Sequence, residues 1–216
     1  MRSTLIALAL SLPTLAFAGP VNLVANGDFE ANALNAGQWK VFAAASNSRT
    51  GTTTPLQGWT LASGSGIELR NQVAGAAQHG SQFVELDSYG NSSMSQAFDA
   101  LALGASYELS FWYAPRAGVR QDSNGLQVFW NGQALSAHAI ETAGVAADAR
   151  GWTPYSFDVV AASGINTLTF AAVGPSDALG GSLDNVSLVQ DVPEPASLAL
   201  SLAGLLGIGA LRRRRA

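Results

Sequence analysis

The sequence predicts an all-β protein, an antiparallel two-sheet β-sandwich of the jelly-roll type, flanked by an apolar N-terminal segment and a single hydrophobic C-terminal helix. Between about residues 21 and 190, short apolar segments alternate with turn residues, and no helical period of any length appears. The 23 glycines and the low charged fraction of 12% suit many short strands joined by turns. The chain has no cysteine, so the sandwich forms without disulfides.

The N-terminus has the pattern of a secretory signal peptide over residues 1–18. Arg2 precedes an apolar stretch that reaches Phe17, and small residues stand at the −3 and −1 positions of a cleavage site between Ala18 and Gly19. The stretch is shorter than the roughly 20 residues that span a bilayer. We therefore expect export and removal of this segment, which leaves the domain over residues 19–191.

The clearest strand of this domain is the segment 107–113, which places Tyr107, Leu109, Phe111 and Tyr113 on one face. The strand 126–130 is followed by Asn131-Gly132, a strong hairpin signal. Further strands are expected at 22–24, 57–61, 66–70, 82–87, 94–98, 153–160, 167–172 and 183–189, and a long loop at 31–55. About ten antiparallel strands at irregular spacing favour a two-sheet sandwich over a repeat array.

The C-terminal segment 192–216 has the composition of a membrane-retained tail. An apolar run follows Pro193, Glu194 and Pro195, and the chain then closes with a basic cluster of Arg212, Arg213, Arg214 and Arg215. A single hydrophobic helix over about 196–211 would be roughly 24 Å long, marginal for a hydrocarbon core of about 30 Å. The arginines would stay on the cytoplasmic side and hold the domain outside.

This tail resembles the sorting tail of PEP-CTERM proteins. The resemblance implies recognition by an exosortase, a membrane-embedded protease, in bacteria that make extracellular polysaccharide. It makes Pro193, Glu194 and Pro195 a substrate motif for that enzyme. It also implies that the protein passes through the inner membrane only transiently, on its way to the cell surface or the extracellular space.

The domain between the signals resembles CenC-type carbohydrate-binding modules and the wider galactose-binding-like jelly rolls. The residues that carry this resemblance are 22–30 (NLVANGDFE), Gly58-Trp59 and 183–188 (LDNVSL). It implies that the first and last strands lie side by side, with one structural calcium ion between them, held by Glu30 and Asp184 and also by Asp28. The alternative is that Asn26-Gly27-Asp28 is only a turn and that Asp184 bonds to local backbone.

The charge balance and the motifs exclude several functions. With both terminal segments set aside, the domain carries a net charge of about −8, so neither nucleic acid nor an anionic membrane is an expected partner. Glu85 and Asp87 alternate on one strand and cannot flank a glycosidic bond from opposite sides. No nucleophile elbow, zinc-protease motif or phosphate loop is present, and we expect no enzyme.

A ligand surface is indicated by Trp112, which alternation places on the polar face with Glu108 and Ser110, away from the expected core. Aromatic rings stack on sugar faces, and planar polar groups bind vicinal hydroxyls. The other candidate ligand-binding residues are Arg116, Gln127, Trp152 and Tyr155. The alternative is that these aromatic residues belong to the core of the sandwich.

The sequence thus predicts an exported, non-enzymatic protein of the cell surface or matrix, whose carbohydrate-binding-like domain engages exopolysaccharide. One alternative is a purely structural matrix component with protein–protein contacts. The last alternative, a polysaccharide hydrolase, lacks a catalytic set.

Overall fold

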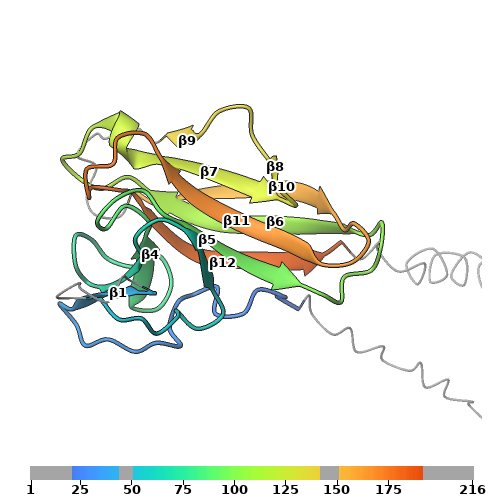
Figure 1. Ribbon diagram of the computed structural model, residues 1–216, viewed down its shortest axis with the longest axis horizontal. Coiled ribbons are helices and arrows are strands. Elements are labelled where there is room, and N and C mark those ends of the chain that lie inside the picture. Colours follow the sequence, from blue (N-terminus) through green and yellow to red (C-terminus); the bar gives the residue numbers. More distant parts are fainter. Residues whose placement is uncertain (1–20, 44–50, 142–150, 192–216) are drawn as a thin grey trace, which may run out of the picture.

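The computed structural model describes residues 21–43, 51–141 and 151–191, and in these ranges the protein is an antiparallel β-sandwich. Two layers of strands face each other across one core (Figure 1). The expected fold class is confirmed. The predicted signal peptide and sorting tail lie outside the described residues, and within those residues no helix is long and apolar enough to cross a membrane.

The first sheet, called sheet A, has the strand order β1-β3-β4-β12-β6-β10. Its strands are β1 (Trp39–Phe42), β3 (Ile67–Asn71), β4 (Gln82–Glu85), β12 (Ser182–Gln190), β6 (Ser106–Ala114) and β10 (Thr153–Val160).

The second sheet, called sheet B, has the order β2-β5-β11-β7-β8, with the short β9 also paired to β7. Its strands are β2 (Thr60–Ser63), β5 (Ser93–Phe98), β11 (Asn166–Val173), β7 (Gly125–Trp130), β8 (Gln133–Ala134) and β9 (Ile140–Glu141). A single 3-10 turn, η1 (Gln121–Asn124), precedes β7.

The core forms where the alternating faces of the two sheets meet. In β6, Tyr107, Leu109, Phe111 and Tyr113 are all buried, as the alternation predicts. The ring of Phe111 meets Phe170 of sheet B edge to face at 5.1 Å. Apolar burial of this kind, at roughly 25 cal/mol per Å², holds the two sheets together.

The hairpin between β7 and β8 is confirmed at Asn131-Gly132. Both residues have positive φ, 52° and 78°, which is the geometry of a type I′ turn. Its twist matches that of the flanking strands, and Asn and Gly are the residues that adopt such angles at the lowest cost.

Two segments differ from the expected pattern. The range 31–55 was expected to be a loop, but it contains β1, an edge strand that pairs with β3 through Lys40 and Leu69. Only four residues long and set among Ala, Asn and Ser, β1 gives too short a pattern to be seen in the sequence.

The expected strand 22–24 does not form, because the side chain of Asn22 takes the place of a backbone ladder: Oδ1 accepts from Leu188 N–H at 3.0 Å, and Nδ2 donates to Val186 O at 3.1 Å.

The first described residues nevertheless lie beside the last strand. Leu23 N–H donates to Leu188 O at 2.9 Å, and Val186 N–H donates to Gly27 O at 2.8 Å. The adjacency of the first and last segments of the domain, implied by the resemblance to galactose-binding-like domains, is present in the structure.

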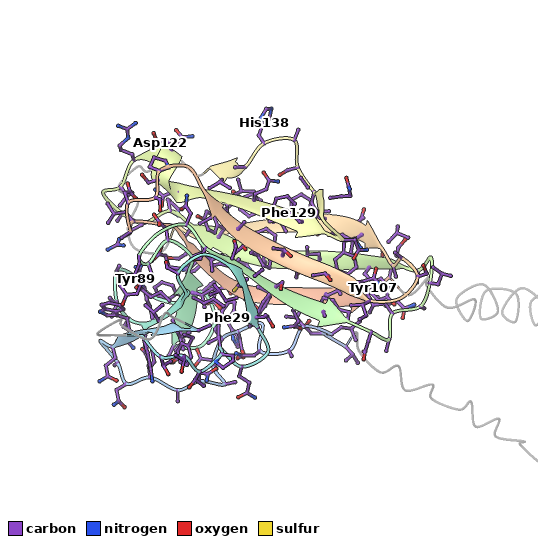
Figure 2. The ribbon with its side chains drawn as sticks, in the orientation of Figure 1. Phe29, Tyr89, Tyr107, Asp122, Phe129 and His138 are labelled. Atoms are coloured by element: carbon purple, nitrogen blue, oxygen red, sulfur yellow. The ribbon has the colours of Figure 1, made fainter. Side chains whose placement is uncertain are left out.

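The sandwich has two ends with different contents (Figure 1). The end where the described chain starts and stops, called the tail end, holds residues 21–23, 99–105, 160–166 and 190–191. The opposite end, called the loop end, holds the connections 86–92, 115–124 and 174–181. Tyr107 lies toward the tail end in Figure 2, whereas Tyr89 and Asp122 lie at the loop end.

Candidate ligand-binding face

Trp112 lies on the outer face of sheet A, the face turned away from sheet B. Its backbone pairs with Asp184 of β12 on one side and with Pro154 of β10 on the other. Residues directly opposite in antiparallel strands point to the same face, so these three side chains share a surface. Trp112 is half-buried, while its neighbours Phe111 and Tyr113 are buried in the core. The structure therefore confirms that Trp112 lies on the opposite face of β6 from the core residues.

Trp152 reaches across the same face. The next residue, Thr153, pairs with Tyr113 of β6, yet the indole of Trp152 meets Phe83 of β4 edge to face at 5.9 Å. Since β4 is two strands from β6 in sheet A, the Trp152 side chain lies over the outer face of the sheet. The Trp152 indole N–H donates to Ala76 O at 3.0 Å, which fixes the ring against the 72–80 connection.

Asp184 lies between these aromatic groups and is fully buried. Its Oδ2 accepts from the backbone N–H groups of Gln78 and His79 at 2.8 and 2.9 Å, and its Oδ1 accepts from Asn185 N–H at 2.7 Å. Burial raises the pKa of Asp184 to about 7, although these hydrogen bonds and the nearby His79 act to lower it.

Glu30 holds the next part of the same loop. Its Oε1 accepts from Ser81 and Gln82 N–H at 2.6 and 2.7 Å, and its Oε2 accepts from the Ser81 hydroxyl at 2.9 Å. Gly80 permits this approach, because it has φ +65° and a Cβ at this position would overlap the Glu30 carboxylate. Glu30 and Asp184 together fasten residues 78–82.

These contacts bear on the expected calcium site. Glu30 and Asp184 meet the same loop, and Asp28 lies close in sequence, with Oδ1 accepting from Glu30 N–H at 3.4 Å. However, the oxygens of Glu30 and Asp184 already accept hydrogen bonds from N–H and O–H donors. Within 21–43, 51–141 and 151–191, no three His, Asp or Glu side chains gather as a metal site. The carboxylates present act as backbone acceptors, and calcium at this place stays a prediction.

The remaining candidate ligand-binding residues are dispersed. Tyr155 lies on the core side of β10 and stacks on Phe111 at 5.6 Å. Gln127 lies on the other sheet, where its amide donates to Ser136 O at 3.3 Å. Arg116 lies at the loop end and donates to Ala178 O at 3.1 Å. The structure therefore brings Trp112 and Trp152 together on one face and places Tyr155 and Gln127 elsewhere.

A buried ionic cluster, which sequence reasoning missed, occupies the outer face of β3 and β4. Arg70 is 3% exposed; its Nε donates to Glu68 Oε1 at 2.5 Å and its Nη2 to Glu85 Oε2 at 2.8 Å. Ser88 donates its hydroxyl to Glu68 Oε2 at 2.5 Å. The alternation of Glu68 with Arg70 on a short strand was the available signal, but it does not distinguish a solvated face from a buried ion pair.

Glu85 and Asp87 fasten the connection between β11 and β12. Glu85 Oε1 accepts from Gly180 N–H at 3.1 Å, and Asp87 Oδ2 accepts from Asp177 and Ala178 N–H at 3.0 Å each. Burial raises the pKa of Glu85 to about 7, against the lowering effect of Arg70. Both carboxylates are fully buried and serve as loop anchors.

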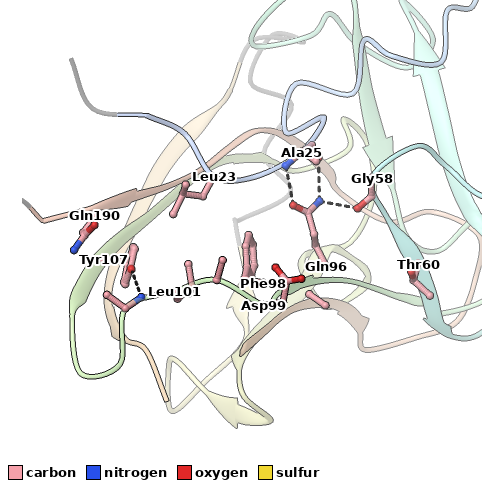
Figure 3. Close-up of a pocket in the computed structure, with 13 residues that line it drawn as sticks. Leu23, Ala25, Gly58, Thr60, Gln96, Phe98, Asp99, Leu101, Tyr107 and Gln190 are labelled. Atoms are coloured by element: carbon pink, nitrogen blue, oxygen red, sulfur yellow. Dashed lines mark hydrogen bonds between the residues drawn. The ribbon is translucent and has the colours of Figure 1, made fainter. Parts of the chain in front are cut away.

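The tail end contains a cavity of about 550 Å³ that opens between the two sheets (Figure 3). Its walls include Leu23, Phe98, Leu101 and Tyr107. The amide of Gln96 is occupied, since Nε2 donates to Ala25 O and Gly58 O at 2.9 and 2.7 Å. The cavity is a recess of mixed character beside the last strand, lined by apolar side chains and by Thr60, Asp99 and Gln190.

Comparison with known proteins assigns the C-terminal segment. Residues 191–215 match the PEP-CTERM protein-sorting motif, as the sequence resemblance predicted. The motif implies an exported protein.

The domain is similar to small parts of very large proteins. It is 30% identical over 178 residues to a multifunctional-autoprocessing repeats-in-toxin protein of Vibrio vulnificus, and 28% identical to that of Vibrio cholerae. In each case the match covers 82% of this chain but 3% of the toxin.

Among solved structures, a Stig cyclase from Fischerella sp. TAU superposes with a TM-score of 0.55 at 16% identity, covering 81% of this chain and 100% of that one. Structural neighbours also include family 35 carbohydrate-binding modules. One, from Clostridium thermocellum, has a TM-score of 0.41 and 16% identity, and covers 61% of this chain and 92% of that one. The Stig cyclase match supports the sandwich fold.

Proposed function

We propose that this protein is an exported cell-surface or matrix component that binds exopolysaccharide through the outer face of sheet A and has no catalytic activity. The observation that carries the proposal is Trp112, a large aromatic side chain that faces outward from a strand whose neighbouring residues form the core.

The surroundings of Trp112 support a sugar ligand. A flat ring can stack on the C–H face of a pyranose, and nearby planar amides can bind its hydroxyls. Asn185 of β12 donates from Nδ2 to Gln78 Oε1 at 2.9 Å, and Gln78 N–H binds Asp184, the residue paired with Trp112. Rigid polar groups next to an aromatic ring are the arrangement that a polysaccharide-binding surface needs.

The burial and hydrogen bonding of three acidic residues support a binding role over a catalytic one. Glu85, Asp87 and Asp184 are fully buried, and each accepts hydrogen bonds from backbone amides. A carboxylate fixed in this way does not reach a glycosidic bond. A hydrolase would instead need two carboxyl groups that face a substrate cleft.

The sorting motif supports the proposed route to the surface. In this account the apolar run 196–211 holds the exported chain in the inner membrane until an exosortase processes the tail at the Pro193-Glu194-Pro195 motif. The arginines 212–215 stay on the cytoplasmic side.

Calcium is proposed as a separate structural ligand of Glu30, Asp28 and Asp184. Binding there would require the loop 78–82 to give up hydrogen bonds to two of these carboxylates. A rise in Tm with calcium over EDTA, abolished by Glu30→Gln, would support the ion. An unchanged Tm would show that the backbone contacts alone hold this loop.

The function is tested by thermal melting of the full chain with a panel of neutral and acidic polysaccharides. A ligand at 100 times its Kd stabilises the native state by about 2.7 kcal/mol, which raises Tm by several degrees. A shift with at least one polysaccharide supports the proposal. A flat panel would contradict it and favour a structural role based on protein–protein contacts.

A further inference from the structure

Most of the large apolar side chains that the described residues expose lie at one end of the sandwich. Of the eight, five belong to the tail end and three lie elsewhere, at Trp39, Tyr89 and Leu179. The five are Val21 (67% exposed), Leu23 (39%), Leu103 (73%), Val160 (56%) and Ile165 (67%). Clustered exposed apolar residues on a soluble domain mark an interaction surface.

Backbone hydrogen bonds join the segments that carry these side chains. Gly104 N–H donates to Ala161 O at 2.9 Å and Ala161 N–H donates to Ala105 O at 3.0 Å, which ties the 99–105 loop to the 161–165 turn. Asp191 N–H donates to Ser106 O at 3.0 Å, so the chain leaves the domain beside the same loop. Leu23 and Gln190 line the tail-end cavity together with Leu101 (Figure 3). The exposed side chains therefore surround the point where the tail leaves the domain.

The charges at the tail end all have one sign. Asp99 and Asp191 are exposed there and Asp158 is exposed just before it on β10, whereas the Lys and Arg side chains that the structure describes lie elsewhere, at positions 40, 70, 116 and 120. Such a surface can bury apolar side chains in a partner without net negative charge, but it is repelled by an anionic one.

The covalent chain limits how far this end can move from the membrane. Four residues, 192–195, lie between Asp191 and Ala196, where the apolar run begins, so five Cα–Cα steps join the two. A fully extended chain spans at most about 3.5 Å per residue, so this link reaches about 17 Å. A tail anchored in the bilayer keeps the exposed leucines and isoleucine close to the lipid surface.

We propose that the tail end docks on the surface of a zwitterionic phospholipid bilayer while the tail is uncleaved, with Leu103, Val160 and Ile165 in the headgroup region. This inference rests on the proposed anchoring by residues 196–211. Docking at this end points the loop end away from the membrane. Because the strands of sheet A run from the tail end to the loop end, the outer face that carries Trp112 would then be roughly perpendicular to the membrane and accessible to polysaccharide.

The absence of cysteine permits a direct test in the full chain. Ile165→Cys carries an environment-sensitive fluorophore at the tail end, and Leu179→Cys carries the same fluorophore at the loop end as the matched control. The chain is reconstituted into phosphatidylcholine vesicles with and without brominated acyl chains. We expect strong quenching by brominated lipid at position 165 and none at position 179.

A second comparison tests the contact surface itself. The double change Leu103→Ser and Val160→Ser, in the Ile165→Cys background, should reduce the quenching. Replacing part of the phosphatidylcholine by phosphatidylglycerol should also reduce it, because the tail end is acidic.

Flotation of the vesicles separates the possible failures. If the chain does not float with the vesicles, the anchoring proposed above is wrong and docking falls with it. If the chain floats but brominated lipid quenches positions 165 and 179 equally or not at all, anchoring stands and docking is overturned. Quenching at 165 that the double change leaves intact would also overturn it, because the contact would then not involve these side chains.

Discussion

The two ends of the sandwich differ in the groups that hold their loops and in the side chains that they expose. At the loop end, connections are held by buried carboxylates: Glu85 and Asp87 fasten residues 177–180, and an adjacent guanidinium, Arg70, neutralises part of the charge. At the tail end, neutral amides take this part: the buried Asn166 accepts from Ala162 N–H at 2.8 Å and donates to Ala162 O at 3.2 Å, while apolar side chains such as Leu103 and Ile165 face outward.

This difference separates stability from interaction. A buried charge is tolerated only when it is paired and hydrogen-bonded, so removal of one partner at the loop end should strongly destabilise the fold. An exposed apolar side chain contributes little to folding, so its presence at the tail end is better explained by a partner than by stability. Substitutions at the loop end should therefore lower the free energy of unfolding, whereas substitutions of exposed apolar residues at the tail end should weaken partner binding and leave stability nearly unchanged.

The largest expected effect is that of Arg70→Met. The change leaves Glu68 and Glu85 buried without their cation, and breaking a buried pair by removing one partner costs about 3–5 kcal/mol. The free energy of unfolding in urea measures this loss. The control is Arg120→Met, which breaks an exposed pair with Asp122 and should leave the urea midpoint nearly unchanged. Equal effects of the two changes would show that the loop end does not depend on the buried cluster.

The next effect is an unusual pH dependence. The pKa of Asp184 is about 7 in the fold, above the ordinary aspartate value of about 3.9. The folded state therefore binds a proton more tightly than the unfolded state. The resulting stabilisation is complete below about pH 4 and is lost as the pH rises through about 7. Glu85, whose pKa is also about 7, contributes stabilisation that is lost over the same pH range.

We accordingly expect the Tm of the full chain to fall between pH 5 and pH 8. Asp184→Asn removes one titrating group and should flatten this slope, although the variant starts from a lower Tm because an amide nitrogen then faces backbone N–H groups. Tm measured across this pH range in both proteins provides the check. A slope that is unchanged in the variant would show that Asp184 does not titrate in this window.

The smallest effect on folding is expected at the tail end. Leu103→Ser and Ile165→Ser alter exposed side chains and should each change the free energy of unfolding by less than about 0.5 kcal/mol. Leu168→Ala, three residues further on and fully buried, should cost about 2–5 kcal/mol. If the serine variants were as unstable as Leu168→Ala, the exposed leucine and isoleucine would be part of the fold and not an interaction surface.

The sequence was sufficient for the fold wherever alternation was strong. The strand 107–113 and the Asn131-Gly132 hairpin followed directly from side-chain period and turn chemistry. β1 could not be found in this way, because a four-residue edge strand depends on its pairing with β3 more than on its own pattern.

The candidate site could be predicted only in part. Alternation placed Trp112 correctly on the outer face, since that depends on one strand alone. Trp152 contacts Phe83 of β4, far from it in the sequence, and the contact between Arg70 and Glu85 joins two strands. Such contacts depend on how the strands are arranged in space, which local sequence patterns do not determine. Tyr155 turned inward and Gln127 lay on the other sheet for the same reason.

The assignment of the ligand-binding face to sheet A is tested by comparing two aromatic residues, one on the outer face of each sheet. Trp112→Ala removes the ring from sheet A, and Phe129→Ala removes a half-buried ring from the outer face of sheet B. Co-sedimentation of each full-length variant with an insoluble polysaccharide that binds the unchanged protein gives the relative affinity. We predict that Trp112→Ala weakens binding at least tenfold, about 1.4 kcal/mol, while Phe129→Ala leaves it unchanged. Equal binding by both variants would contradict the assignment of the ligand-binding face to sheet A.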